Sequence, residues 1–450
     1  MNAITSATNK PQLKPQVDPP PVPISIEDLG IPQVVLENLL LKHLSHESKV
    51  DTINLSLLMG LSSQLVQELL SVLRNRSLIE VFQPNSDSYN GGKDRFTASR
   101  ILYGLSGQGI QEAELAFLKD AYIGPAPVSL NDYNFIVSQQ DIRNNNISYN
   151  NVVHALRGVY GAEYMVPILG PALNSGRALL LYGNSGTGKS YVAAQLLNAF
   201  DTSVYIPYSV YASGSVIKVY SELHHTQLDN NSSVQTVNFS DQYDRRWALC
   251  ERPNIQVGGE LTMDMLEINH SESNRVWMAP LQMLANNGLL IIDDLGRQTI
   301  PVDTLLNRWI VPMEYSVDYL VLPNGQQFSV PFVLTLAFST NLSPLEISDP
   351  AFLRRLGYKI EFTALTESTY LELFTDLVEA KEFAINSLTI EHLLLLHRQF
   401  KVPFFPCIPK DIIGISQDII KFEGRDPEVT ANVLEASWRL YFTSDGLEGI

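Results

Sequence analysis

The segment with the clearest chemical potential is LLLYGNSGTGKS, residues 179–190, which has the spacing G-x-x-x-x-G-K-S of a phosphate-binding loop. Its glycines let backbone N–H groups converge on phosphate oxygens, and the following helix adds the positive end of its dipole. Lys189 would bridge the β- and γ-phosphates, and Ser190 would ligate Mg²⁺. An apolar strand over 178–182 and a helix-forming run after the loop supply the context that the motif requires. The candidate nucleotide-binding residues are Gly183, Asn184, Ser185, Gly186, Thr187, Gly188, Lys189 and Ser190.

Two carboxylates follow a second apolar run, in NNGLLIIDDLGRQ at residues 286–298. The run 289–292 predicts a buried strand, whose carboxyl end faces the ligand crevice in an open α/β sheet. Asp293 would hold Mg²⁺ through water, and Asp294 would orient or deprotonate the attacking water.

A third predicted strand ends in Ser339-Thr340-Asn341, where the Asn341 side chain can reach the γ-phosphate or the attacking water. Arg354 and Arg355 precede a further strand, YKIEFT, and suggest an arginine finger. Such a finger stabilises charge on the γ-phosphate and is often supplied by a neighbouring subunit; a surface pair that forms salt bridges is the alternative. No N-K-x-D motif follows the phosphate loop, which favours ATP over GTP.

These motifs, in this order, resemble those of an AAA+ ATPase. Several segments also resemble a bacterial family described as predicted AAA+ ATPases with chaperone activity and linked by name to Flp pilus assembly. They are YIGPAPVSLNDY, LGPALNSGRALLLYGNSGTGKS, RRWALCERPNIQVGGELTMDML, APLQMLANNGLLIIDDLGRQ, LLNRWIVPMEYSVDYLVLPNGQQFSVPF and FSTNLSPLEISDPAFLRRLGYKI. The resemblance covers roughly residues 31–445 and implies an AAA+ core with an α-helical lid.

The resemblance also implies roles for matching residues. Lys189 and Ser190 match Walker A, Asp293 and Asp294 match Walker B, and Asn341 matches sensor 1. Arg355 matches the finger, with Arg354 as its rival. In IPKDIIG, Lys410 stands where relatives have the sensor-2 arginine, and lysine meets a phosphate as a point charge without the planar fork of arginine.

The regions before the phosphate loop predict separate domains. Residues 31–100 show a helix, a helix–turn–helix capped by Ser62 and Ser63, and a hairpin, which is the order of a winged-helix domain. Five basic and four acidic residues over 61–100 give this part a net charge of +1, which is low for a DNA-binding surface. Docking of a protein and contact with DNA both stay open.

The expected architecture is α/β: a parallel-sheet P-loop core flanked by helices, with an N-terminal winged helix and a C-terminal helical lid. The predicted domains are a disordered Pro-rich tail over 1–27, a winged helix over 28–110, a connector over 111–150, an AAA+ core over 151–360 and a lid over 361–450. SVYIPYS, 203–209, is the expected second strand of the core, and an insertion follows at about 209–280. In that insertion Tyr208, Tyr211, Tyr220 and residues 263–265 either contact a client at a ring pore or pack locally.

Composition limits the remaining functions. The 450 residues predict about three folding units at roughly 150 residues each. The net charge of −17 argues against broad coating of nucleic acid, and the two cysteines form no disulfide framework or zinc cluster. No apolar segment has the length of a signal peptide or membrane span, so we expect a cytoplasmic chain without membrane insertion.

The sequence therefore predicts Mg²⁺-dependent binding and hydrolysis of ATP by a homo-oligomeric ring that remodels or assembles a protein partner. Two alternatives are an ATP-controlled regulator bound to DNA through the winged helix, and a nucleotide-gated scaffold with little turnover.

Overall fold

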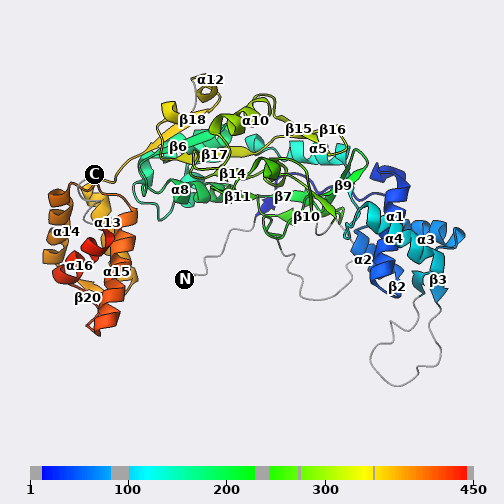
Figure 1. Ribbon diagram of the computed structural model, residues 1–450, viewed down its shortest axis with the longest axis horizontal. Helices are drawn as coiled ribbons and strands as arrows, with labels where there is room; N and C mark the ends of the chain where they lie inside the picture. The colour runs from blue at the N-terminus through cyan, green and yellow to red at the C-terminus, as the bar shows by residue number, and fades with distance from the viewer. Residues whose placement is uncertain (1–12, 83–100, 229–242, 272–274, 348–349, 443–450) are drawn as a thin grey trace.

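The computed structural model describes residues 13–82, 101–228, 243–271, 275–347 and 350–442 (Figure 1). An N-terminal helical module, a central α/β body and a C-terminal helical bundle follow one another along an arch (Figure 1). Among the described residues no single helix has the length and apolar composition to cross a bilayer, and one pair of helices, Thr52–Met59 with Ser63–Asn75, meets those criteria only with a bend of 108° between them.

A five-stranded parallel sheet forms the centre of the α/β body, which confirms the α/β prediction. Its strand order is β11-β14-β17-β6-β18. The strands are β6 (Leu179–Gly183), β11 (Asn254–Val257), β14 (Leu289–Ile292), β17 (Thr335–Thr340) and β18 (Tyr358–Phe362). β14 is the continuous apolar run LLII, as expected for a strand covered on both faces.

Alternate side chains of these strands enter two cores, because successive residues point to opposite faces. Leu180, Leu290 and Phe338 pack with Trp309 of α10 (Val302–Tyr315) on one face. Leu181 and its neighbours on the other face pack with a second set of helices. That set comprises α6 (Tyr149–Ala155), η3 (Ala162–Tyr164), α7 (Val166–Ser175), α8 (Lys189–Gln195) and η4 (Leu196–Ala199).

The prediction that residues 203–209 form the second strand of this sheet is wrong. β7 (Thr202–Pro207) pairs with β10 (Trp247–Cys250) and with β1 (Lys14–Pro15) in a separate sheet. β11, from the segment expected to be an insertion, lies beside β14 instead. The backbone segments that lead into β11 and β14 lie so close together that position 288 must be glycine, because a Cβ on Gly288 would lie 2.1 Å from the carbonyl oxygen of Pro253.

Apart from β10 and β11, the described strands of the expected insertion belong to a second five-stranded sheet. Its order is β12-β13-β9-β8-β5, and it includes a hairpin of β8 (Ser209–Ala212) with β9 (Ser215–Lys218). The other strands and short helices around it are β5 (Val128–Ser129), β12 (Asn269–Ser271), β13 (Val276–Met278), α5 (Leu130–Gln139), η5 (Met263–Leu266) and α9 (Leu281–Leu284). A hairpin of β15 (Val317–Val321) and β16 (Gln327–Pro331) connects α10 to β17.

The N-terminal module contains the helices predicted there and an antiparallel pair of strands. Its elements are η1 (Glu27–Leu29), α1 (Gln33–His46), β2 (Val50–Asp51), α2 (Thr52–Met59), α3 (Ser63–Asn75), β3 (Ile79–Phe82), β4 (Leu102–Leu105) and α4 (Gly107–Lys119). Ser62 caps α3, as predicted, by accepting a hydrogen bond from the N–H of Leu65 at 3.3 Å. β3 pairs antiparallel with β4, whereas the expected strand RFTAS lies outside the described residues.

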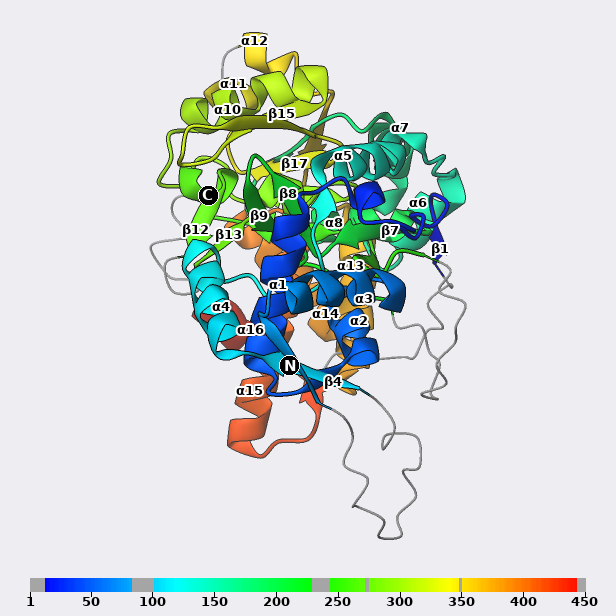
Figure 2. The ribbon, with the colours of Figure 1, turned by 90° about the vertical axis from the view of Figure 1, so that its right-hand side faces the viewer.

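The N-terminal module is fixed to the body through the second sheet (Figure 2). Val216 of β9 belongs to the apolar core of the module, and Tyr211 of β8 packs against that core. The N–H of Ala126 donates to the carbonyl of Met59 at 2.7 Å. Tyr211 is therefore half-buried in a junction between domains. Tyr208 and Tyr220 pack on one another with ring centroids 5.0 Å apart.

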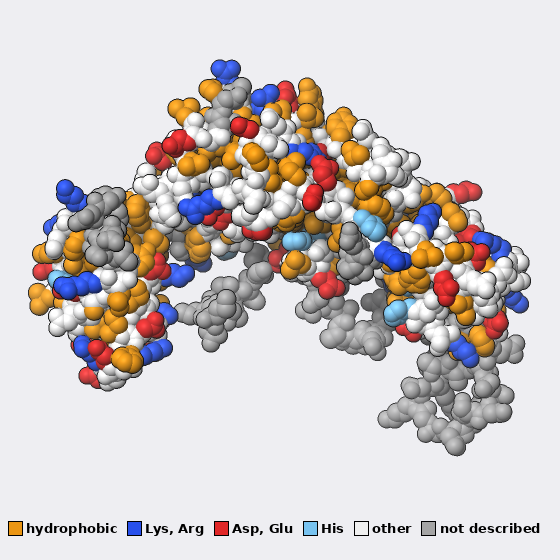
Figure 3. Space-filling model, in the orientation of Figure 1, with side chains coloured by type: hydrophobic (Ala, Val, Ile, Leu, Met, Phe, Trp, Pro, Cys, Tyr) orange, Lys and Arg blue, Asp and Glu red, His pale blue; other side chains and the backbone are white. Residues whose placement is uncertain are grey.

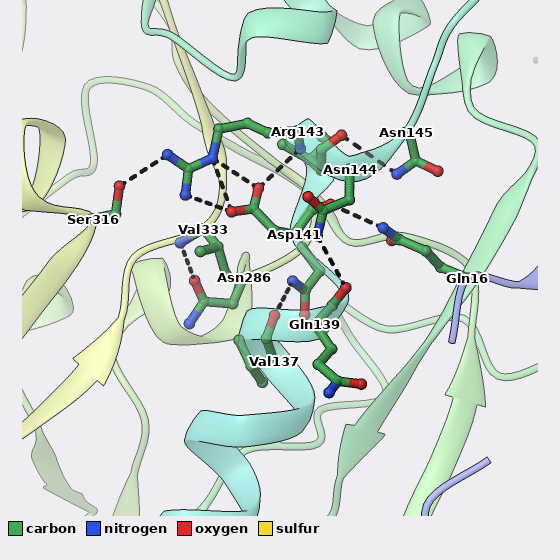
Figure 4. Close-up of polar contacts among 12 residues, drawn as sticks. Gln16, Val137, Gln139, Asp141, Arg143, Asn144, Asn145, Asn286, Ser316 and Val333 are labelled. Atoms are coloured by element: carbon green, nitrogen blue, oxygen red, sulfur yellow. Dashed lines mark hydrogen bonds and ion pairs between the residues drawn. The ribbon is translucent and has the colours of Figure 1, made fainter. Parts of the chain in front are cut away.

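Part of the segment expected to be a disordered tail has a defined position. Besides the β1–β7 pairing, Gln16 donates from Nε2 to the carbonyl of Asp141 at 2.9 Å. Figure 4 shows Gln16 beside the turn at 139–145, which includes η2 (Ile142–Asn144). The disorder prediction is wrong for residues 13–27, and residues 1–12 lie outside the described part of the chain.

The C-terminal bundle has four helices, in the region that the sequence predicts to be helical. They are α13 (Glu367–Ala380), α14 (Ser387–Phe400), α15 (Cys407–Glu423) and α16 (Ala431–Tyr441), with β19 (Ala384–Ile385) paired to β20 (Glu428–Val429). Tyr370, Phe374 and Trp438 fill its core. Two short helices, α11 (Pro344–Ile347) and α12 (Pro350–Leu353), precede β18 and the bundle.

Candidate nucleotide-binding site

The predicted phosphate-binding loop connects β6 to α8 at the carboxyl end of the central sheet. β14 and β17 are parallel to β6, so the residues that follow them reach the same edge. A cavity of about 600 Å³ lies between this edge and the C-terminal bundle. Loop residues 185–190 line it together with Asp294 and Asn341. The structure therefore brings together motifs that are separated by 150 residues in sequence.

Lys189 is buried at the centre of the loop. Its Nζ donates to the carbonyls of Gly183 and Asn184, at 2.9 and 2.8 Å, and to Oδ1 of Asn341 at 2.9 Å. Burial lowers the pKa of Lys189, and Asp294 and Asp293 oppose that shift. The predicted Walker A lysine and sensor-1 asparagine are thus in direct contact. Gly183 and Asn184 do not line the cavity but position the ammonium group through their carbonyls.

The two residues expected to hold magnesium also contact one another. Ser190 Oγ donates to Oδ1 of Asp293 at 2.7 Å. Oδ2 of the same carboxylate accepts a hydrogen bond from Nε2 of Gln256, on the neighbouring strand β11, at 2.9 Å. A hydroxyl and a carboxylate oxygen are the hard ligands that Mg²⁺ prefers, so the residues present fit this ion.

Asp294 has a special backbone conformation, with φ of 50°. Its N–H donates to Oδ1 of Asp293 at 3.1 Å, and the next residue, Leu295, donates from N–H to the carbonyl of Ser339 at 2.8 Å. These contacts place the Asp294 side chain on the cavity wall, with 48% of it exposed. Arg297 Nη1 lies 3.7 Å from its carboxylate. An accessible carboxylate at this point can accept a proton from water.

Arg354 and Arg355 are exposed at a different edge of the body. Arg355 lines a separate cavity of about 340 Å³ beside Ala178 and Leu334, which precede β6 and β17. Its Nη2 lies 3.7 Å from Glu314 Oε2 on α10. Close by, Arg143 Nη1 donates to Ser316 Oγ at 3.1 Å (Figure 4). The structure does not bring either finger candidate to the phosphate loop of its own chain.

The C-terminal bundle forms the other wall of the nucleotide cavity. Lys410 and Cys407 at the start of α15 line it, so Lys410 faces the same space as the loop. Apolar side chains of Val159, Met165 and Leu377 line it as well. The sequence alone did not identify this apolar wall, because its members come from a turn, a helix start and a distant helix. Gln256 was also missed, since the strand that carries it was assigned to an insertion.

A family model described as "Domain of unknown function (DUF8689)" matches residues 366–440, which form the C-terminal bundle. No curated protein matches the chain.

Several solved structures show a distant likeness to the chain. One is the Thermotoga maritima RuvB Holliday junction branch migration motor, at 16% identity and a TM-score of 0.37, with 65% of this chain and 73% of that chain covered. Another is NtrX from Brucella abortus in complex with ADP, at 14% identity and a TM-score of 0.38, with 63% and 56% covered. A further NtrX structure has 13% identity and a TM-score of 0.40, with 73% and 59% covered.

Proposed function

We propose that the chain is a Mg²⁺-dependent ATPase of the AAA+ class that binds ATP between the central body and the C-terminal bundle. The observation that carries the proposal is the convergence of Lys189 with Asn341 and of Ser190 with Asp293 at one cavity. The strand order supports it, because the loop-bearing strand β6 lies between β17 and β18, which brings Asn341 to the side of the loop.

Each side chain has a physical role in this proposal. Lys189 would exchange its contact with Asn341 for phosphate oxygens, which leaves the Asn341 amide free to orient the attacking water. Asp294 would accept the proton of that water. Ser190 and Asp293 would hold Mg²⁺, which neutralises charge on the phosphates when bound. Gln256 would orient the Asp293 carboxylate from behind, as outer partners of metal ligands do.

Assembly into a ring is part of the proposal. Arg355 lies at the amino-terminal ends of β6 and β17, whereas the phosphate loop lies at the carboxyl end of β6. A finger at that position can reach the nucleotide of a neighbouring copy, and a head-to-tail interface of this kind closes into a ring.

The N-terminal module would engage the protein partner. The outer face of α2 exposes Ile53, Leu57 and Leu58, with Leu57 55% exposed. Apolar side chains are unsuited to contact with phosphates but are common in protein interfaces. Acidic and basic side chains are interspersed on the visible face of this module (Figure 3). These features favour protein docking by the expected winged helix over the DNA-bound alternative.

The test is ATP turnover of the purified chain at several protein concentrations with Mg²⁺. We expect specific activity to rise with concentration and to be lost in Lys189→Ala and Asp294→Asn, while the control Asp303→Asn, at an exposed position on α10, retains it. Tight nucleotide binding with negligible turnover in the wild type would favour the scaffold alternative. Salt-sensitive binding of duplex DNA that requires Arg74 and Arg76 would favour the DNA-bound regulator.

A further inference from the structure

The C-terminal bundle contacts the phosphate-binding loop itself. The N–H of Cys407, the first residue of α15, donates to the carbonyl of Gly186 at 3.3 Å. Gly186 has φ of +79°, and a Cβ placed on it would lie 2.4 Å from Cys407 Sγ. The approach is therefore so close that only glycine fits at this position of the loop.

A second contact joins the bundle to the body away from the phosphate loop. The Tyr160 hydroxyl donates to Oδ2 of Asp376, in the third turn of α13. Burial first, and then the bond to Asp376, raise the pKa of Tyr160 to about 12. A tyrosine phenol is protonated at neutral pH even without this shift, so Tyr160 acts as the donor to the carboxylate.

The two contacts lie on the same cavity. Tyr160 and Cys407 both line it, and so do Leu373 and Leu377, which flank Asp376 on α13. Lys410 lies one turn after Cys407 on α15 and faces the same cavity. A bundle held at both points is seated on the body in one orientation, which fixes where Lys410 stands relative to Lys189.

We propose that Tyr160 and Asp376 form a positioning pair that seats the C-terminal bundle, and with it Cys407 and Lys410, against the phosphate-binding loop. The pair does not touch the reacting atoms. It controls how long the cavity stays closed and hence how long a nucleotide stays bound. The inference rests on the proposed function, because it assumes that the cavity holds the nucleotide.

The first test needs no nucleotide. Cys407 is one of two cysteines, and the other, Cys250, is fully buried. Maleimide labelling at Cys407, followed by mass spectrometry, therefore reports how tightly the bundle is seated. We expect Tyr160→Phe, which lacks the donor, and Asp376→Ala, which lacks the acceptor, to be labelled several-fold faster than the wild type. The double variant should be no faster than either single variant, since residues in contact are not additive.

The second test is the rate at which a fluorescent ADP analogue dissociates. A hydrogen bond to a charged group predicts about tenfold faster release in each variant, again without additivity. As the nucleotide is released faster, kcat should also fall, because Lys410 is no longer held in position against the phosphate-binding loop. Glu379→Ala on the same helix and Tyr149→Phe on α6 are matched controls, and both positions are exposed.

The outcomes separate the two proposals. Labelling and release at wild-type rates in variants with unchanged melting temperature overturn the positioning pair and leave the ATPase proposal standing. Additive effects in the double variant overturn it too, because they show that the two side chains act separately. A wild-type chain that binds no ADP overturns the proposed function and this inference with it, whereas faster labelling of both variants together with faster release supports the pair.

Discussion

Gly186→Ala should weaken nucleotide binding through two separate costs, one in the backbone and one in side-chain contact. The backbone at Gly186 is in the left-handed region, which costs an L-residue roughly 1–2 kcal/mol. That penalty alone weakens nucleotide binding about 5- to 30-fold, because binding requires the strained loop. The new methyl group would also lie 2.4 Å from Cys407 Sγ. Either the loop or α15 must then move by about 1 Å, a displacement that can cost about 100-fold in a reacting geometry.

A second substitution separates these two costs. Cys407→Ala removes the sulfur, and the remaining Cβ of residue 407 is 3.4 Å from the new methyl group, which is an ordinary contact. The double variant should therefore recover the part of the loss caused by the clash and keep the 5- to 30-fold caused by the backbone. Fluorescent ADP titrations of both single variants and the double variant measure this, with thermal melts to verify folding. A double variant that binds as weakly as Gly186→Ala would show that the bundle does not rest on the loop, and would refute the reasoning.

Three further predictions follow from other contacts. Gln256→Leu should raise the Mg²⁺ concentration for half-maximal ATPase activity about tenfold, as loss of an outer partner does, while the exposed control Gln327→Leu leaves it unchanged. Arg355→Ala should be inactive alone but should regain turnover when mixed with Lys189→Ala, because each chain then supplies what the other lacks; no recovery would argue against a finger acting between chains. The bundle should lose stability below about pH 6.5, where unfolded histidine is protonated, because burial lowers the pKa of His397. This loss on acidification, followed by thermal melts from pH 7.5 to 5, should disappear in His397→Asn.

The sign of the His397 effect follows from its contacts. Nδ1 lies 2.9 Å from the carbonyl of Val402 and must donate to it, so Nε2, 2.8 Å from the Tyr370 hydroxyl, is left to accept. Protonation would put a second donor at Nε2 and a charge among Phe404 and Trp438. Folding therefore favours the neutral imidazole of His397. Its contribution to the free energy of unfolding is complete above the pKa that histidine has in the unfolded chain, and it is lost as pH falls through the lower pKa of the folded state.

The sequence was sufficient for the residues whose chemistry is local. The loop 183–190 has a spacing that specifies its own backbone path, and the runs at 289–292 and 335–340 are apolar enough to be strands under any packing. The carboxyl ends of parallel strands lie at the same edge of a sheet, so the residues that follow these strands are expected to lie close together. The contact of Lys189 with Asn341 is a direct consequence of that rule.

The errors arose where tertiary pairing decides the outcome. β7 has a stronger β-forming sequence than β11, yet β11 takes the place beside β14. The β11 sequence NIQV is short and half polar. Its position beside β14 depends on the close backbone contact that Gly288 allows with Pro253, and no local sequence pattern predicts that contact. The prediction of a disordered tail over 1–27 is wrong for residues 13–27 for the same reason. Their order comes from pairing with β7 and from the buried guanidinium of Arg252, which donates to Thr202 Oγ1 at 3.0 Å and to Gln16 Oε1.

The corrected position of β11 changes where a partner is expected to act. The hairpin β8–β9, which could have lined a ring pore, carries Tyr211 and Val216 into the apolar junction with the N-terminal module. Side chains committed to that junction cannot move independently against a translocating client. β11 leads from Gln256, which donates a hydrogen bond to the proposed magnesium ligand Asp293, through Val257 into the same apolar core that supports the hairpin. A change at the proposed phosphate site therefore has a continuous packed route to the N-terminal module. The exposed apolar face of α2 on that module is the surface at which we expect a partner to respond to it.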